Sequence, residues 1–288
     1  MLKLTEVKAI LREYNIRPSK RFGQNFLIDQ NIKNKIIDSI QLKKEDVVLE
    51  IGPGLGALTE DLYKKAKGVI AIEKDKRLYS FLLNKIDIRS DRRTEVCSVR
   101  RSELGLINDD ILKYEFKDIS SKLIVVGNLP YSISSPILNK LIDNRKYIKS
   151  VYATLQMEFG ERLVAPPGTK DYSSLSCYAQ FYGEPKILFK IPKGAFFPAP
   201  EVDSCFLRIG MEKQIDISID QEMLFKIIRS SFEKRRKTIL NSLYSSGIFK
   251  SKEEALISLE KARISPGRRP ETISLQEFIS LSRIIPPK

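Results

Sequence analysis

The residues best suited to chemistry in this sequence follow two short apolar runs. Residues 47–51 (VVLEI) lead into Gly52-Pro53-Gly54-Leu55-Gly56, and Glu73 follows the next apolar run, twenty-one residues after Gly52. Glycines after a strand let the chain turn sharply and let a ligand approach the backbone. An acid at the end of the second strand can accept hydrogen bonds from both hydroxyls of a ribose. This spacing predicts that Gly52, Gly54 and Glu73 bind a nucleoside cofactor.

The glycine spacing alone leaves two cofactors open. The dinucleotide fingerprint G-x-G-x-x-G places its third glycine one residue later than Gly56 does, and Pro53 stiffens the loop. A nicotinamide cofactor also carries a pyrophosphate that needs the N-terminus of the next helix, expected near Ala57, whereas S-adenosylmethionine carries none. The sequence therefore disfavours a nicotinamide oxidoreductase and leaves the decision to the fourth apolar run.

That fourth run, residues 123–126, leads into the segment Asn128-Leu129-Pro130-Tyr131. Ligands of an open α/β sheet lie at the carboxyl ends of its strands, so this segment is expected beside the glycine-rich turn. The proline holds Leu129 extended. The side-chain oxygen of Asn128 and the carbonyl of Leu129 can then accept hydrogen bonds from one planar amine, and Tyr131 offers a ring on which a base can stack. Methylation of an exocyclic adenine amine requires such an arrangement.

Composition agrees with this chemistry. The sequence contains no histidine, which excludes Ser-His-Asp and Cys-His catalysis, H-E-x-x-H zinc proteases and C₂H₂ zinc fingers. Transfer of a sulfonium methyl group to a positioned amine relies on orientation and desolvation and needs no imidazole. The three cysteines, Cys97, Cys177 and Cys205, are too few and too scattered for a disulfide framework or a zinc knuckle. We expect them to be small buried hydrophobic residues and expect no metal.

A doubly wound α/β sheet is the element that would bring these motifs together. Short unbroken apolar runs alternate with helical patterns, which is typical of parallel strands buried on both faces. The expected strands are 47–51, 69–72, 104–107, 123–126, 151–155, 187–191 and 202–209. The expected helices are an N-terminal one around 4–11 and others at 31–40, 221–246, 252–261 and 274–284. We therefore predict an α/β domain over 1–210 and a small all-helical domain over 211–288.

The charge balance points to a polyanionic partner. Lysine and arginine number 50 against 36 acidic residues, which gives a net charge of +14. Basic residues concentrate at 17–21 and 85–101 and in the expected helix at 234–237, although the pattern of 85–101 favours a solvated loop over an RNA-facing one. No apolar run reaches the ~18 residues of a membrane span, and the N-terminus has no signal-peptide pattern. We expect a cytoplasmic monomer whose RNA-binding residues are Lys20, Arg21, Lys234, Arg235, Arg236 and Lys237.

Taken together, the motifs make the sequence resemble the ribosomal RNA adenine N6,N6-dimethyltransferases over nearly its whole length. The matching segments are FGQNFL at 22–27, LEIGPGLGALT at 49–59, AIEKD at 71–75, DDIL at 109–112, GNLPYSIS at 127–134, PGTKDYSSLS at 167–176, AFFPAPEVDS at 195–204 and FEKRRKTILNSL at 232–243. The resemblance implies a Rossmann-like methyltransferase domain that uses S-adenosylmethionine. It also implies dimethylation of two adjacent adenosines in the 3′-terminal hairpin of small-subunit (16S) ribosomal RNA, with the immature small ribosomal subunit as partner.

The same resemblance implies roles for individual residues. Tyr131 and Phe196 would sandwich the target adenine, and Phe197 fills the variable place of the F-x-P pattern. Asn128 would contact both the target amine and the methionine part of the cofactor. The residues implied for the cofactor as a whole are Gln24, Asn25, Leu27, Gly52, Gly54, Glu73, Asp110 and Asn128.

Two further members of this fold class stay open as alternatives. One is a large-subunit ribosomal RNA adenine methyltransferase of the macrolide-resistance type, and the other is a ribosome-assembly factor that has lost catalysis. The segment PGTKDY and the long match through the C-terminal domain favour the small-subunit enzyme. The sequence departs from the family at Ser132, at Ser173-Ser174 and in the long interval between Glu73 and Asp110, which predicts an enlarged loop there.

Overall fold

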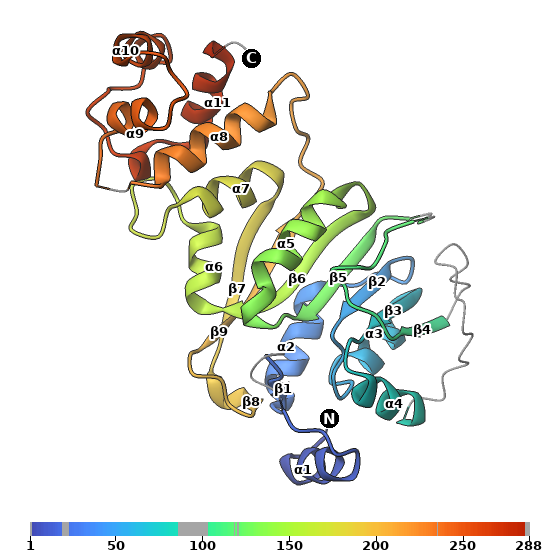
Figure 1. The fold of residues 1–288 in the computed structure, drawn as a ribbon. Helices are drawn as coiled ribbons and strands as arrows, with labels where there is room; N and C mark the ends of the chain where they lie inside the picture. The colour runs from blue at the N-terminus through green and yellow to red at the C-terminus, as the bar shows by residue number, and fades with distance from the viewer. Residues whose placement is uncertain are drawn as a thin grey trace. The chain divides into compact units, whose positions relative to one another are not determined.

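A computed structural model of the protein describes residues 2–18, 23–85, 103–117, 119, 121–234 and 236–285 (Figure 1). The chain forms two compact units, Met1–Met157 with Lys186–Glu212 and Glu158–Pro185 with Lys213–Lys288. Contacts thus group residues 158–185 with the C-terminal helices, whereas the sequence pattern assigned them to the domain ending at about 210.

The first unit is built on a seven-stranded mixed sheet of order β4-β3-β2-β5-β6-β9-β7 (Figure 1). The first five strands of that order are parallel, and β9 pairs antiparallel with β6. The strands are β2 (Val47–Ile51), β3 (Gly68–Ile72), β4 (Glu103–Ile107), β5 (Leu123–Asn128), β6 (Ile148–Gln156), β7 (Glu184–Ile191) and β9 (Ser204–Gly210). Every strand expected from an apolar run is present, and the predicted Rossmann-like sheet is confirmed.

The register of these strands aligns their carboxyl ends. Ile51 of β2 lies opposite Ile72 of β3 and Gly127 of β5, and Ile72 lies opposite Ile107 of β4. Because parallel strands end at the same edge of a sheet, the polar residues that follow these positions gather at one edge. The sheet thereby places the glycine-rich turn, Glu73 and Asn128 within one region.

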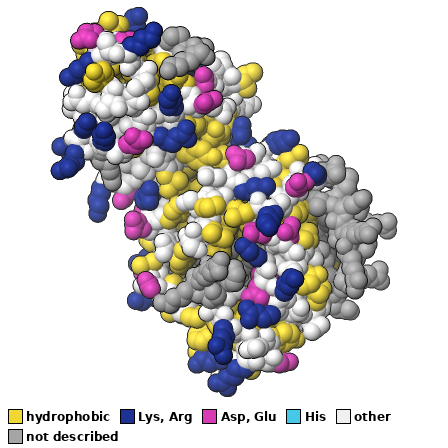
Figure 2. All heavy atoms as spheres, in the orientation of Figure 1, with side chains coloured by type: hydrophobic (Ala, Val, Ile, Leu, Met, Phe, Trp, Pro, Cys, Tyr) yellow, Lys and Arg dark blue, Asp and Glu magenta, His cyan; other side chains and the backbone are white. Residues whose placement is uncertain are grey.

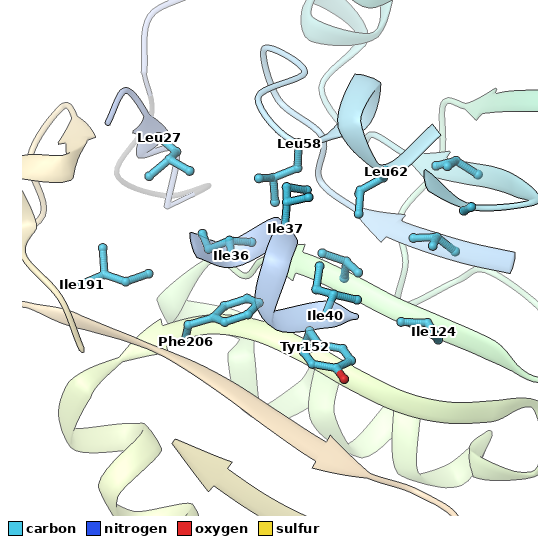
Figure 3. Packing of buried hydrophobic residues seen from close by; sticks show 14 of the residues in the cluster. Leu27, Ile36, Ile37, Ile40, Leu58, Leu62, Ile124, Tyr152, Ile191 and Phe206 are labelled. Atoms are coloured by element: carbon cyan, nitrogen blue, oxygen red, sulfur yellow. The ribbon is translucent and has the colours of Figure 1, made fainter. Parts of the chain in front are cut away.

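Two helices cover one face of the sheet with a continuous apolar surface. Ile36, Ile37 and Ile40 of α2 (Gln30–Ile40) and Leu58 and Leu62 beside or within α3 (Thr59–Lys65) belong to one buried cluster. Figure 3 shows these side chains directed toward strand residues such as Ile124 and Tyr152. The spacing i, i+1, i+4 in α2 makes one apolar stripe, and the side chain of Asp29 caps the first turn by accepting hydrogen bonds from the N–H groups of Asn31 and Ile32.

A smaller ladder attaches the N-terminal segment to the first unit. β1 (Phe26–Leu27) pairs antiparallel with β8 (Phe196–Phe197), with Phe26 opposite Phe197 and Leu27 opposite Phe196. The helix α1 (Leu4–Glu13) buries Val7 and Leu11 in a cluster that also contains Phe26 and residues of α4 (Lys76–Lys85). The first unit also contains α5 (Ser134–Asp143). The two-residue ladder therefore sets the segment at 23–27 next to the aromatic segment at 196–197.

The second unit is helical among its described residues. Its helices are α6 (Met157–Val164), α7 (Ser174–Tyr182), α8 (Gln221–Phe232), α9 (Ile239–Ser245), α10 (Lys252–Lys261) and α11 (Leu275–Ile284). The single helix expected at 221–246 is wrong, because α8 ends at Phe232 and the hydroxyl of Thr238 caps a new helix by accepting from the N–H of Asn241. In the part of the chain that the structure describes, no helix is long and apolar enough to cross a membrane.

Candidate active site

A cavity of about 340 Å³ opens at the carboxyl ends of the parallel strands. It is lined from β2 by Glu50 and Ile51, from the end of β3 by Glu73, from β5 by Asn128 and from β6 by Thr154. All the residues that the sequence assigned to a cofactor line this cavity, namely Gln24, Asn25, Leu27, Gly52, Gly54, Glu73, Asp110 and Asn128. The structure thus brings together residues that lie as much as a hundred positions apart in the sequence.

Glu73 occupies the centre of a network of backbone donors. Its Oε2 accepts from the N–H of Gly54 at 3.0 Å, and its Oε1 accepts from the N–H of Asp75 at 2.9 Å. Burial raises the pKa of Glu73, and these backbone hydrogen bonds oppose that rise. The side chain is 6% exposed, so its carboxyl group is held in one position before any ligand arrives.

Gly54 of the glycine-rich turn has to be a glycine for two reasons. First, Gly54 has φ +59°, a left-handed conformation in which a residue with a side chain is strained. Second, a Cβ at this position would meet the ring of Phe26 at 3.4 Å. Its N–H is the one that binds Glu73. The helix after the turn begins at Thr59, two residues beyond the expected start near Ala57. The turn therefore joins the β2 and β3 edges through a backbone-to-carboxylate bond.

The NLPY segment is tied to the segment that precedes β1. The side-chain N–H of Asn128 donates to the carbonyl of Asn25 at 2.7 Å. Gly23, with φ +56°, approaches so closely that a Cβ on it would lie 2.9 Å from Cβ of Pro130. Because the amide nitrogen of Asn128 is engaged in this way, the group presents its oxygen Oδ1 as a hydrogen-bond acceptor at the cavity.

Gln24 is fixed by the residue that follows the Glu73 turn. Its side-chain amide donates to Oδ2 of Asp75 at 3.0 Å. Arg77 also binds Asp75, donating from Nε at 3.3 Å and from its backbone N–H at 3.0 Å. Burial works to raise the pKa of Asp75, and the bonds from Arg77 and Gln24 outweigh it, so that this pKa lies below its ordinary value. The sequence singled out the AIEKD motif but gave Asp75 no role, because its partner Gln24 lies 51 residues away.

Asp110 faces the cavity with a lysine beside it. Its Oδ2 lies 2.7 Å from Nζ of Lys74, and its Oδ1 accepts from the N–H of Leu112 at 3.0 Å. Burial alone would raise the pKa of Asp110, and these two contacts lower it below its ordinary value. Both Asp109 and Asp110 line the cavity, so the structure permits either carboxylate to reach a ligand there.

Glu50 is a cavity residue that the sequence reasoning missed. It lies within β2, is 2% exposed, and its Oε2 has no hydrogen-bond partner among the described residues. Burial raises its pKa to about 8, more than offsetting the neighbouring Thr59 side chain, and the nearby Glu73 raises it further. The signal was available, because Glu50 is the acid in the otherwise apolar run VVLEI.

The two aromatic candidates have different surroundings. Tyr131 is half-buried, and its hydroxyl shares a hydrogen bond of 2.5 Å with the hydroxyl of buried Ser204, another residue without a role in the sequence analysis. Phe196 lines the cavity but is only 3% exposed and belongs to the core cluster that contains Leu27. A base stacked on Tyr131 can use its half-open ring, whereas stacking on Phe196 requires a rearrangement of that buried ring.

The basic residues expected to contact RNA fall in two groups. Lys234, Arg236 and Lys237 are exposed in the turn between α8 and α9, so the expectation that they lie on a helix is wrong. The physical reason is that the Thr238 cap and a turn closed by the N–H of Lys237 on the carbonyl of Lys234 end the helical pattern. Lys20, Arg21, Arg235 and the segment 86–101 lie outside the described residues.

The cavity suits a cationic nucleoside better than a dinucleotide. Its acidic lining residues are Glu6, Glu50, Glu60, Glu73, Asp75, Asp109 and Asp110, against the lysines Lys33, Lys74 and Lys85. Because acidic residues outnumber lysines in this lining, the cavity favours a ligand that carries positive charge over one that carries a pyrophosphate. Across the described residues, no cluster of three or more His, Cys, Asp or Glu side chains could hold a metal ion. The donor set therefore fits S-adenosylmethionine, which carries an ammonium and a sulfonium group.

Comparisons with known proteins agree with this geometry. A family model described as "Ribosomal RNA adenine dimethylase" matches residues 15–285. A protein of Moorella thermoacetica called "Ribosomal RNA small subunit methyltransferase A" is 39% identical, covering 96% of this chain and 96% of the relative. A protein of the same name from Geobacillus thermodenitrificans is 38% identical, covering 97% and 95%.

Solved structures show the same fold. A dimethyladenosine transferase from Plasmodium falciparum superposes with a TM-score of 0.75 at 26% identity, covering 89% of this chain and 95% of that one. The "23S rRNA methyltransferase ErmE" superposes with a TM-score of 0.69 at 22% identity, covering 91% and 99%. At that identity, the second likeness concerns the fold alone.

Proposed function

This chain belongs to the ribosomal RNA adenine dimethylase family, whose members use S-adenosylmethionine, and we propose that it dimethylates N6 of two adjacent adenosines in the 3′-terminal hairpin of 16S ribosomal RNA. The observation that carries the proposal is the Asn128 amide, which is bound to the Asn25 carbonyl at 2.7 Å on the wall of an acidic cavity. The choice of the small subunit is supported by relatives of that name that match almost the whole chain.

The residues of the cavity have separable roles in this reaction. Glu73 would hold the ribose hydroxyls, Asp110 the adenine amine, and Gln24, Asn25 and Leu27 would close over the methionine end. Glu50, to which the sequence assigned no role, would offer the cofactor a hydrogen-bonding carboxyl group rather than a full negative charge, because burial raises its pKa to about 8. S-adenosylmethionine supplies an electrophilic methyl group on a positive sulfur atom.

Catalysis by the protein's own groups is then a matter of orientation. An adenine amine is a poor nucleophile because its lone pair is delocalised into the ring. In the first transfer, Oδ1 of Asn128 and the carbonyl of Leu129 would accept its two N–H groups and hold the nitrogen so that the lone pair is free to attack. The methylated nitrogen would then release one proton to solvent, and its remaining N–H would be held by one of the same two acceptors in the second transfer. The N–H of Leu129 donates to the carbonyl of Thr154 at 3.2 Å, which fixes the strand end that carries this pair. Tyr131 would hold the flipped base by stacking.

The setting of the reaction follows from its substrate. We propose that the protein acts in the cytoplasm as a monomer on immature small ribosomal subunits and contributes to their biogenesis. The exposed cations Lys234, Arg236 and Lys237 would contact RNA phosphates together with Lys20, Arg21 and Arg235.

Methyl transfer to defined particles tests the proposal. Purified protein, labelled S-adenosylmethionine and small-subunit particles lacking the modification are incubated, and the modified bases are mapped. We expect label on N6 of two adjacent adenosines near the 3′ end, with up to two methyl groups on each. Label on large-subunit RNA would select the macrolide-resistance type of enzyme. Binding to particles without any methyl transfer would select a non-catalytic assembly factor.

A further inference from the structure

A second depression of the first unit, separate from the cofactor cavity, lies between α1 and β8. It is lined by Lys8, Leu11, Arg12, Pro18, Phe197 and Pro198 and is termed the α1–β8 groove below. The proposed roles above use none of these residues. Figure 2 shows Lys and Arg side chains gathered at the end of this unit where Figure 1 places α1.

The groove combines an apolar floor with a cationic rim. Leu11 is 6% exposed, and Phe197 and Pro198 are half-buried beside it. Lys8 and Arg12 are exposed and one helical turn apart, which places them on the same face of α1. Nζ of Lys8 lies 5.4 Å from the centre of the Phe197 ring. Cations beside an aromatic ring are what a single-stranded nucleotide needs, since its phosphate pairs with the cations and its base stacks on the ring.

The groove adjoins the place where the target base would be bound. Phe196 lines the cavity and the next residue, Phe197, lines the groove, and both pair with β1. α1 is shared in the same way, because Glu6 and Val7 line the cavity while Lys8 and Leu11 line the groove. Successive residues of a strand are about 3.3 Å apart and face opposite sides. The cavity and the groove are therefore neighbours on the same two elements, α1 and β8.

We propose that the α1–β8 groove binds the unpaired nucleotide next to the target adenosine, with its base on Phe197 and its phosphate on Lys8 and Arg12. The proposal rests on the proposed function in taking RNA as the substrate and in placing the target adenosine at the cavity. It has a consequence for a pair of adjacent adenosines, because one adenosine occupies the groove while its neighbour is methylated in the cavity. Phe197 stands in the variable place of the F-x-P pattern, and the cavity roles proposed above do not use it.

Binding of a short RNA to the full-length protein tests the groove directly. The probe is a fluorescently labelled single-stranded oligoribonucleotide with two adjacent adenosines, followed by anisotropy over a series of salt concentrations. The first variant is the double replacement Lys8→Ala with Arg12→Ala, and the second is Phe197→Ala, with Phe197→Leu as a variant that keeps apolar volume. The matched control is Lys43→Ala with Lys44→Ala, two exposed lysines just before β2, at the opposite edge of the sheet.

The variants should separate charge from stacking. Loss of both cations should weaken RNA binding by about 10- to 100-fold at low salt and should reduce the slope of log K against log salt by about 0.7, since single strands contribute ~0.7 per neutralised phosphate and both cations face the same phosphate. Phe197→Ala and Phe197→Leu should each weaken binding by about 10-fold and leave that slope unchanged. The cofactor dissociation constant, measured by calorimetry, should stay within twofold of the wild type in every variant.

Three results would overturn the proposal. These are no binding of the oligoribonucleotide by the wild-type protein, groove variants whose RNA affinity stays within twofold of the wild type, and a control pair that loses as much affinity as the Lys8 and Arg12 pair. Groove variants that bind the oligoribonucleotide normally but no longer bind small-subunit particles would assign the groove to a protein partner instead. RNA binding is measured without methyl transfer. If the proposed 16S activity fails, the methyl-transfer assay gives no product while the oligoribonucleotide still binds in the groove.

Discussion

The cofactor cavity and the α1–β8 groove use the same two elements, α1 and β8, yet they differ in charge and construction. The charged residues that line the cavity are mostly acidic, and Glu73, Asp75 and Asn128 are each bound to neighbours through hydrogen bonds of 2.7–3.0 Å. The groove has an apolar floor and exposed Lys8 and Arg12. One site is positioned in advance for a small cation, and the other is open toward a polyanion.

Because of this difference, we expect the two sites to respond differently to substitutions and to salt concentration. A buried acceptor held by backbone N–H groups loses its function when its geometry changes, largely independent of salt. An exposed cation acts through long-range attraction that salt screens. Variants of the cavity should therefore affect catalysis or cofactor affinity, and variants of the groove should affect RNA affinity and its salt dependence.

The largest effect is expected from Asn128→Ala. The substitution removes the proposed acceptor for the adenine amine and the bond to the Asn25 carbonyl, so the rate of methyl transfer in a single turnover should fall about 100-fold or more. Cofactor affinity, measured by calorimetry, should change by less than about 10-fold. Asn34→Ala, on the exposed side of α2, is the matched control and should keep the wild-type rate. An unchanged rate in Asn128→Ala would show that Asn128 has no role in methyl transfer.

Glu73→Gln should have the next largest effect, and on a different step. The amide keeps the shape of the carboxyl group but offers one oxygen in place of the two that receive Gly54 and Asp75. Loss of a charged acceptor should weaken cofactor binding by about 10- to 100-fold. RNA binding to the oligoribonucleotide should be unchanged, and Glu45→Gln, exposed before β2, should change neither. A Glu73→Gln protein with weaker RNA binding and normal cofactor binding would reverse the assignment of the two sites.

Much of the fold and of the cavity could be predicted because both depend on buried patterns. The runs VVLEI and LIVVGN form β2 and β5, and strand register alone brings Gly52, Glu73 and Asn128 to one edge. Asp75 and Ser204 could not be assigned, because their partners Gln24 and Tyr131 lie 51 and 73 residues away and only the packed structure brings them together.

The positions of the exposed basic residues, by contrast, could not be predicted from the sequence. The helical pattern at 221–246 hid the break at Thr238, since a single capping hydroxyl outweighs a weak periodicity. The sequence analysis assigned no role to Lys8 and Arg12, and their relation to Phe197, far away in the sequence, appears only once β1 and β8 pair. The sequence shows how many basic residues the chain has, but it does not show which of them lie on the same surface.

A smaller effect, on stability, should follow from the buried acid of the cavity. The pKa of Glu50 is about 8 in the folded protein against an ordinary value of 4.5, so between these values the folded state holds a proton that the unfolded chain has released. The free energy of unfolding should therefore decrease as the pH rises from about 5 to 8. Glu50→Gln removes this dependence and should melt at a higher temperature than the wild type at pH 8, with less difference at pH 5.

Melting curves of the cofactor-free protein at several pH values measure this slope. The groove variant Lys8→Ala retains Glu50 and should keep the wild-type slope, which separates the two sites again. A Glu50→Gln protein whose melting temperature depends on pH as steeply as that of the wild type would show that Glu50 is not the group that holds the extra proton.

The smallest effect should come from Ser204→Ala. This substitution tests whether the ring of Tyr131 is held in position by a hydrogen bond, as the side chains of the cavity are. Burial raises the pKa of Tyr131, so its hydroxyl stays protonated and its hydrogen bond of 2.5 Å to Ser204 anchors the half-buried ring. Removing the anchor should cost about 1 kcal/mol of stability and lower the methyl-transfer rate about 3- to 10-fold, while cofactor affinity is unchanged. Tyr131→Phe should have the same effect, and the double variant should be no worse than either single one, since both remove one bond. Additive losses would mean that the two hydroxyls act separately and that the ring of Tyr131 is positioned by packing alone.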